Sequence, residues 1–175
     1  EVLNREDFYP SMALLYLAAI LRTKNHKPVM LDLNNAVVHN HKEKYLDYCK
    51  KVIIDSLNEH QPDLVGINCL FSGVFPDVLE FAQIIKSHSP DLKIAIGGIH
   101  PTSFYKEILT NCNDIDYVVI GEGENAIVQL AASIEEKNGN LLSSIKSFAY
   151  RDKDGVVRIN REKNYVENLS SLPMP

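Results

Sequence analysis

The chain has 175 residues, of which 45% are hydrophobic and 23% charged, and its formal net charge is −5. This length suffices for one domain with a sizeable core and leaves no room for a second full domain. Lys and Arg are spread along the chain, which excludes nucleic acid as an expected partner. No apolar run approaches the roughly 18 residues of a membrane-spanning helix, and Cys49, Cys69 and Cys112 are too far apart to predict a disulfide framework or a zinc site. We therefore expect a cytoplasmic protein with no membrane partner.

The first sixty residues have the patterns of a helix, a strand, a loop and a second helix. Residues 10–21 are rich in helix formers and apolar on nearly all sides, which predicts a helix packed on a sheet. The short apolar run 28–33 predicts a strand, and Asp32 lies near its carboxyl end. Residues 34–41 predict a loop, and the three-to-four spacing of apolar residues in 42–60 predicts a helix with one buried face.

Three further units each combine a buried strand with an amphipathic helix. The strands are expected at 63–69, 92–98 and 116–121, and the helices at 75–87, 103–111 and 124–137. Continuous apolar strands between amphipathic helices predict an open α/β fold whose mainly parallel sheet is covered by helices on both faces.

The pattern changes after residue 140. Two short strand patterns, 147–151 and 156–160, flank an Asp-Gly turn and predict a β-hairpin. We therefore expect an α/β domain over residues 1–142, followed over 143–175 by the hairpin and a linker.

Ligands of an open parallel sheet bind outside the carboxyl ends of its strands, where the chain order reverses. The loops that follow the expected strands, 32–34, 68–73, 97–102 and 121–124, should therefore share one rim. Gly97 and Gly98 can let a bulky ligand approach the backbone, and they fit equally well a tight turn without a ligand.

The polar residues of these loops each have two interpretations. Asn68 and Ser72 can hydrogen-bond a ligand or form turns and caps, and His100 can face a ligand or stabilise its own loop. Glu122 can present a carboxylate to a partner, whereas Glu124 fits a helix start, where acidic residues are favoured.

Taken in order, these segments resemble the cobalamin-binding domain of the radical S-adenosylmethionine family. The resemblance rests on residues 10–21, 29–34, 62–67, 116–124, the segment Gly97-Gly98-Ile99-His100-Pro101-Thr102 and the closing Leu172-Pro173-Met174-Pro175. It implies a flavodoxin-like, Rossmann-like fold in which the nucleotide tail of cobalamin lies between strand ends and the corrin ring lies over the rim. The cofactor-binding residues that it implies are Asn68, Leu70, Ser72, Gly97, Gly98, Ile99, His100, Gly121 and Glu122.

The sequence departs from related proteins in several ways. Asn68 stands where relatives often have Ser or Thr, so Ser72 would have to supply that hydroxyl. No Asp-x-His-x-x-Gly loop is present, so we expect no histidine ligand on cobalt. Relatives have an apolar first strand, and only residues 1–4 could represent it here, so we expect that strand to be truncated or missing.

The resemblance also implies a larger protein. The family's three-cysteine motif, which holds a 4Fe–4S cluster that binds S-adenosylmethionine, should follow Pro175, and Cys49, Cys69 and Cys112 cannot replace it because they lie on different elements. We expect no catalysis by this chain alone, and a cobalamin-dependent, methyltransferase-like radical enzyme in the full-length protein. Two alternatives stay open: a cofactor-free docking domain, and a receiver-like or flavodoxin-like signalling domain. A receiver needs an acidic cluster at its strand ends and a lysine after its last strand. Here Asp32 is a lone acid and Gly121 follows the last parallel strand, which disfavours that alternative.

Overall fold

A computed structural model describes residues 11–33, 42–137 and 139–175 of the chain. Its helices are α1 (Met12–Thr23), α2 (Lys42–His60), α3 (Phe75–His88), α4 (Ile99–Asn111) and α5 (Glu124–Glu135). Its strands are β1 (Leu64–Asn68), β2 (Lys93–Gly97), β3 (Tyr117–Val119), β4 (Phe148–Arg151) and β5 (Val157–Asn160). Short 3₁₀ turns are η3 (Ser72–Val74), η4 (Gly139–Ser144) and η5 (Leu169–Ser171).

The five strands form one mixed sheet in the order β1-β2-β3-β4-β5. The pairs β1–β2 and β2–β3 are parallel, whereas β3–β4 and β4–β5 are antiparallel. The predicted hairpin is thus confirmed, and its first strand extends the sheet by pairing with β3. The division of the chain at residue 142 stays a prediction.

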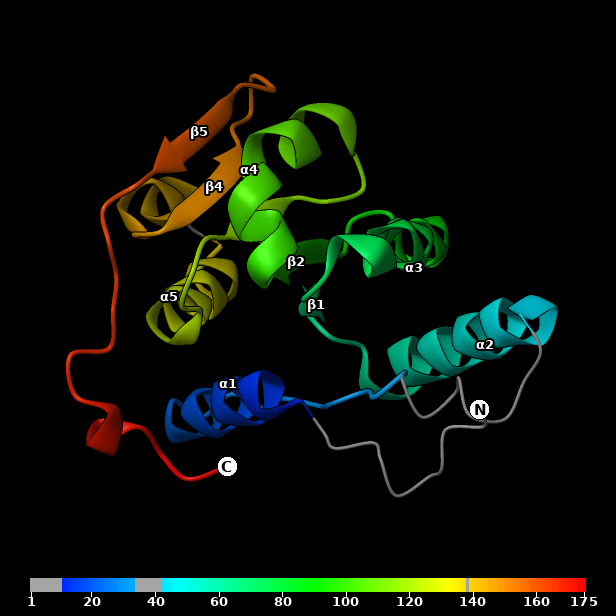
Figure 1. The fold of residues 1–175 in the computed structure, drawn as a ribbon, viewed down its shortest axis with the longest axis horizontal. Helices are drawn as coiled ribbons and strands as arrows, with labels where there is room; N and C mark the ends of the chain where they lie inside the picture. Colours follow the sequence, from blue (N-terminus) through cyan, green and yellow to red (C-terminus); the bar gives the residue numbers. More distant parts are fainter. Residues whose placement is uncertain (1–10, 34–41, 138) are drawn as a thin grey trace.

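Helices cover both faces of this sheet, as the sequence predicts (Figure 1). Ile94, Ile96 and Val118 point to a core shared with α2, α3 and α4. The alternate residues Ala95, Tyr117 and Val119 belong to a second core with α5, against which Leu17 and Leu21 of α1 pack. The central residues of β2 and all of β3 are buried on both faces of the sheet, which explains their continuous apolar sequence, whereas β1 lies at the edge and is only partly buried.

Arg151, at the end of β4, ties the hairpin to the connection between α4 and β3. Its guanidinium donates hydrogen bonds to the carbonyl oxygens of Leu109, Cys112, Asn113 and Ile115. Carbonyls at the carboxyl end of a helix have no partners within the helix, and a cation is favoured there. One side chain therefore satisfies the end of α4 and fixes where β3 begins.

Two predictions about elements are wrong. Residues 28–33 form no strand, and Val29, Met30 and Leu31 are exposed. An apolar run becomes a strand only when a neighbour completes its hydrogen-bond ladder, and among the described strands β1 pairs with β2 alone. Helix α4 begins at Ile99, four residues before the predicted start, because Gly98 adopts a φ of 113° and turns the chain directly into the helix.

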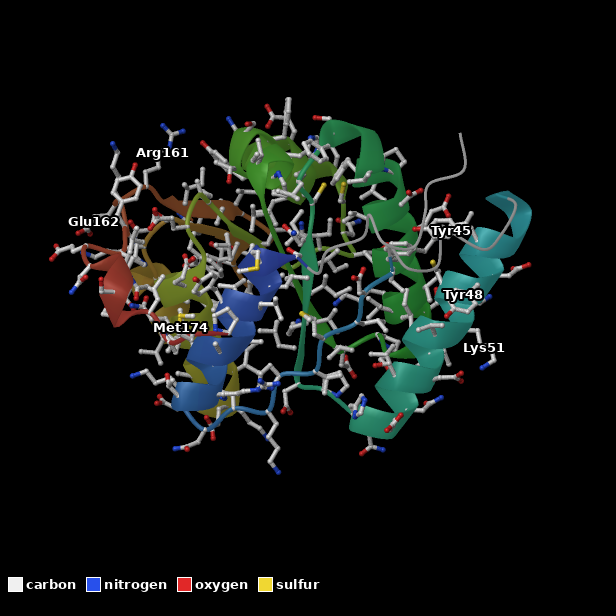
Figure 2. All side chains as sticks on the ribbon, turned by 60° about the horizontal axis from the view of Figure 1, so that its bottom comes forward. Tyr45, Tyr48, Lys51, Arg161, Glu162 and Met174 are labelled. Atoms are coloured by element: carbon white, nitrogen blue, oxygen red, sulfur yellow. The ribbon has the colours of Figure 1, made fainter. Side chains whose placement is uncertain are left out.

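The prediction of a truncated first strand at residues 1–4 and that of a loop at 34–41 lie outside the described residues. Within the described ranges, no helix combines the length and apolar character needed to cross a bilayer. After β5 the chain runs past α5 and ends beside α1, and Met174 lies in this final stretch (Figures 1 and 2).

Candidate functional site

Three of the four predicted loops meet at the carboxyl end of the parallel strands. The backbone N–H of Cys69 donates to the carbonyl oxygen of Gly97 at 2.8 Å. Nδ1 of His100 lies 2.9 Å from Oγ of Ser72. These contacts join loop 68–73 to loop 97–102.

The third loop is joined through Thr102, whose hydroxyl donates to the carbonyl oxygen of Gly98 at 2.8 Å and accepts from the N–H of Gly121 at 2.9 Å. We call the edge formed by loops 68–73, 97–102 and 121–124 the rim. Of the fourth predicted loop, Leu33 packs against the core shared with α2 and α3, and Asn34 lies outside the described residues.

Gly98 is required by the protein's own packing. A Cβ built on Gly98 would collide with the carbonyl oxygen of Cys69 and lie 2.8 Å from its carbonyl carbon, and the φ of 113° disfavours any other residue. The missing side chain therefore lets two rim loops touch. At Gly97 a Cβ would meet only Cβ of Val119, at an ordinary 3.7 Å. Of the two interpretations of this glycine pair, the tight turn accounts for Gly98.

His100 occupies an aromatic sandwich at the rim. Its ring centroid lies 4.4 Å from that of Phe75 and 4.8 Å from that of Phe104. Helix α4 is distorted at Phe104, where φ is −122° and ψ is 21°. While Nδ1 is paired with Ser72, Nε2 is buried and has no hydrogen-bond partner among the described residues. A buried polar atom without a partner is uncommon in folded proteins and needs an explanation.

The rim also exposes several large apolar side chains. Phe71 follows β1 and is 67% exposed, and Ile99 begins α4 and is 64% exposed. Leu70, Val74 and Phe104 are exposed as well. Leu70 and Phe71 lie in loop 68–73 and Ile99 in loop 97–102, and Val74 and Phe104 follow shortly after these loops. Exposed apolar surface therefore lies on both sides of the hydrogen-bonded pair Ser72 and His100. Such a surface is typical of a ligand or partner contact.

Two predicted site residues bond instead to other parts of the chain. Nδ2 of Asn68 donates to Oγ of Ser11, the residue that caps α1, at 3.3 Å. Oε2 of Glu122 accepts from the backbone N–H of Val166 at 2.9 Å. Asn68 thus fixes α1 to the tip of β1, and Glu122 holds the chain that follows the hairpin. Glu124 begins α5 as predicted.

Sequence reasoning did not single out Thr102, which joins two of the loops, nor Phe104, which completes the sandwich around His100. Thr102 lies two residues after His100, inside a segment already expected at the rim, so its hydroxyl could have marked it as a candidate site residue. Nothing in the sequence marked Phe104 in this way, because an apolar residue within a helix is most simply interpreted as core.

The rim offers no metal-binding thiolate. Cys69 is fully buried and its Sγ lies 3.6 Å from the carbonyl oxygen of Phe71. Burial raises the pKa of the Cys69 thiol, so it stays protonated at neutral pH. In the part of the chain that the structure describes, no group of three His, Cys, Asp or Glu side chains could hold a metal ion.

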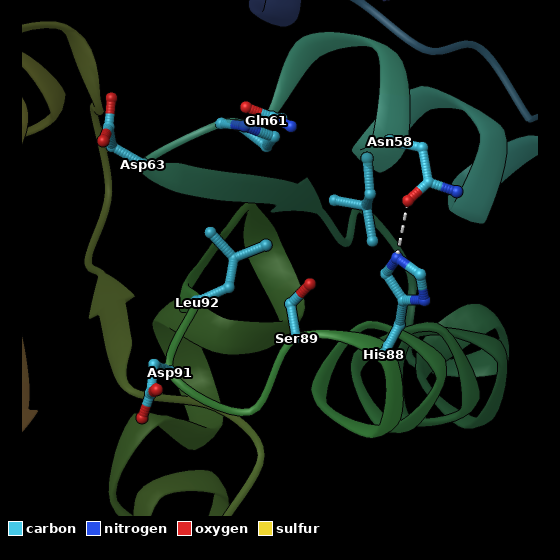
Figure 3. Close-up of a pocket in the computed structure, with 9 residues that line it drawn as sticks. Asn58, Gln61, Asp63, His88, Ser89, Asp91 and Leu92 are labelled. Atoms are coloured by element: carbon cyan, nitrogen blue, oxygen red, sulfur yellow. Dashed lines mark hydrogen bonds between the residues drawn. The ribbon is translucent and has the colours of Figure 1, made fainter.

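A separate hollow of about 440 Å³ lies at the opposite end of the sheet, before the starts of β1 and β2 (Figure 3). Asp63 and Asp91 line it, and His88 is joined to Asn58 by a 3.0 Å hydrogen bond. The ligand edge of an open parallel sheet is its carboxyl edge. The rim, not this hollow, is therefore the candidate site.

Comparisons with known proteins identify the family of the chain. Residues 2–131 match the family described as the B12 binding domain, and the chain belongs to that family. The chain is 30% identical over 169 residues to cytidylyl-2-hydroxyethylphosphonate methyltransferase of Streptomyces wedmorensis, a match that covers 92% of this chain and 31% of that protein. It is 27% identical over 149 residues to an anaerobic magnesium-protoporphyrin IX monomethyl ester cyclase of Synechocystis, covering 85% of this chain and 28% of the relative.

The fold is that of a solved cobalamin-binding protein. A structure of OxsB, a cobalamin-dependent S-adenosylmethionine radical enzyme with aqua-cobalamin and S-adenosylmethionine bound, superposes with a TM-score of 0.69 at 20% identity, covering 89% of this chain and 20% of OxsB. The predicted family and flavodoxin-like fold are thereby confirmed. This chain spans less than a third of the length of each of these proteins.

Proposed function

We propose that this chain binds cobalamin at the rim and, within a longer cytoplasmic protein, presents it to a radical S-adenosylmethionine core in the same polypeptide. One observation carries the proposal: three strand-end loops are held together beneath an exposed apolar surface that is edged by hydrogen-bonding groups. A corrin has a broad apolar ring and a periphery of amide side chains, which matches that combination.

Several features of the rim support this fit. Phe71 and Ile99 offer apolar contact to the ring, and burying their exposed surface contributes favourable free energy. A Cβ at Gly121 or at Gly73 would meet no atom within 4 Å, so the backbone of both loops is open to a large ligand. Ser72 and His100 supply hydrogen-bonding groups beside them.

The protein's part in this function is binding and orientation. Cobalamin, when bound, would supply methyl transfer or radical chemistry, and the 4Fe–4S cluster and S-adenosylmethionine would belong to the core. The Glu122–Val166 hydrogen bond connects the rim to the chain that leads toward Pro175. A rigid connection there would set the direction in which the cofactor faces the core.

Gel filtration after incubation with hydroxocobalamin tests the proposal. We expect the chain to retain corrin absorbance in its own peak at a stoichiometry approaching one, with reduced retention by the double variant Phe71→Ser/Ile99→Ser. If the folded wild-type chain, verified by circular dichroism, elutes free of corrin, cobalamin binding is contradicted and a cofactor-free docking domain is favoured. The full-length protein should in addition show the charge-transfer absorbance of an iron–sulfur cluster, lost on mutation of its cysteines.

A further inference from the structure

The imidazole of His100 is only partly buried, and one of its ring nitrogens is paired while the other is buried and unpaired. Nδ1 lies 2.9 Å from the hydroxyl oxygen of Ser72, and Nε2 is buried without a partner among the described residues. A neutral imidazole carries a proton on one nitrogen and accepts on the other, so the partner of Nδ1 sets the role of Nε2. Leaving a buried donor unpaired is costly.

The ring is also held in place. Phe75 lies against one side of His100 and Phe104 against another, at centroid distances of 4.4 and 4.8 Å. Phe75 begins α3 and Phe104 lies in α4, so the ring is held between two helices. An imidazole that served only to join the two loops could have left Nε2 facing solvent. Here Nε2 is buried in a ring that packs beside two aromatic side chains.

We propose that Ser72 donates its hydroxyl proton to Nδ1 of His100, and that Nε2–H thereby becomes a preset hydrogen-bond donor for an acceptor oxygen of the bound corrin. This inference rests on the proposed function. Ser72 is a positioning residue, because it acts by fixing the tautomer of His100. Two parts of cobalamin offer acceptor oxygens, namely the amide side chains of the ring and the phosphodiester of the nucleotide tail.

Phe104 is a half-exposed neighbour of the His100 ring. Phe104 is 45% exposed, and it is the residue within α4 whose backbone dihedral angles are not helical. Rotation of a half-exposed ring requires little repacking, so Phe104 can adjust when a ligand sits on the rim beside His100.

Nitrogen-15 NMR of the histidine rings of the whole chain tests the inference. Without ligand, the resonances of His100, assigned by their loss in His100→Gln, should show a protonated Nε2 and an accepting Nδ1. Ser72→Ala should mix the two tautomers, and Ser72→Thr should restore the first. A merely structural role for Ser72 would change stability without changing the tautomer.

Addition of hydroxocobalamin provides the second arm. The Nε2 resonance of His100 should shift, while that of His88, which is bonded to Asn58 at the opposite end of the sheet, should not. His100→Gln should weaken binding about three- to tenfold, and His88→Gln should leave it unchanged. If cobinamide, which lacks the nucleotide tail, reproduces the shift, the acceptor is a ring amide. If only intact cobalamin does so, the acceptor is in the tail.

The outcomes separate the two proposals. Retained corrin absorbance with an unshifted Nε2 resonance overturns the role of His100 and leaves cobalamin binding intact, since an ordered water would then account for Nε2. An Nδ1-protonated His100 in the ligand-free protein overturns the role of Ser72. Absence of corrin binding to the folded chain overturns both proposals.

Discussion

The two ends of the parallel sheet are built in opposite ways. At the amino end, the carboxylate of Asp116 accepts from Nζ of Lys86 at 2.8 Å, from Nζ of Lys93 at 3.2 Å and from the N–H of Ile94 at 2.9 Å. The carboxylate of Asp116 is thus paired within the protein. At the rim, apolar side chains are exposed and Nε2 of His100 has no described partner.

The difference indicates which end serves stability and which serves function. Matched charges and satisfied backbone groups lower the free energy of the folded chain by themselves. Exposed apolar surface and an unpaired donor do not, and they are tolerated where a ligand satisfies them. Mutations at the two ends should therefore separate folding stability from cobalamin affinity.

The largest effect is expected from Gly98→Ala, which should lower the free energy of unfolding by roughly 3 kcal/mol or more. The new methyl group would collide with the backbone of Cys69 at a φ of 113°. Urea denaturation measures the change. Gly66→Ala, where a Cβ meets no atom within 4 Å, is the control and should stay close to wild type. A stable Gly98→Ala variant would show that the loops need not touch.

Asp116→Ala should cost about 2 kcal/mol of folding stability, because it removes the acceptor of the N–H of Ile94 and leaves Lys86 with the carbonyl oxygen of Leu92 alone. Asp55→Ala, which removes an exposed pair with Lys51, is the control and should leave the urea midpoint close to that of wild type. Urea titration measures both changes. The affinity of Asp116→Ala for cobalamin should be unchanged. A loss of affinity comparable to the loss of stability would contradict the assignment of stability to the amino end and of cobalamin binding to the rim.

Phe71→Ser and Ile99→Ser should have the opposite profile. Each should weaken cobalamin binding about fivefold to tenfold, or about 1 kcal/mol, through the loss of apolar contact. Neither should alter the urea midpoint, since both side chains are already exposed. Val156→Ser, at an exposed apolar position in the hairpin turn, is the control and should change neither quantity. Calorimetric titration with hydroxocobalamin distinguishes the variants.

The smallest effect concerns the hairpin turn. A hydrogen bond from Arg158, together with backbone hydrogen bonds, lowers the pKa of Asp152. The ionised carboxylate therefore stabilises the folded hairpin above about pH 4, the unfolded pKa, and this contribution disappears as the pH falls through the lower folded pKa. The difference in urea midpoint between wild type and Asp152→Asn should shrink toward pH 2. A difference that persists at pH 2 would assign it to the backbone bonds instead.

Much of the fold could be predicted because it is encoded locally. The helices at Met12–Thr23 and Lys42–His60 follow from the spacing of apolar residues, and the hairpin from its Asp-Gly turn. Among the candidate site residues, Ser72 and His100 do meet at the rim. Glu122 was expected to line the rim, yet its carboxylate accepts from Val166, 44 residues away, a contact that no local pattern contains.

By itself, the sequence determined most of the helices and strands in their order, the hairpin and the family, because periodicity, turn residues and ordered motifs are properties of neighbouring residues. Only the tertiary structure decided that 28–33 forms no strand, that Gly98 lets two loops touch, and that His100 keeps one nitrogen unpaired. Each of these depends on which distant segments come to lie side by side. Hydrogen-bond ladders, backbone collisions and buried donors are defined only once both partners are in place.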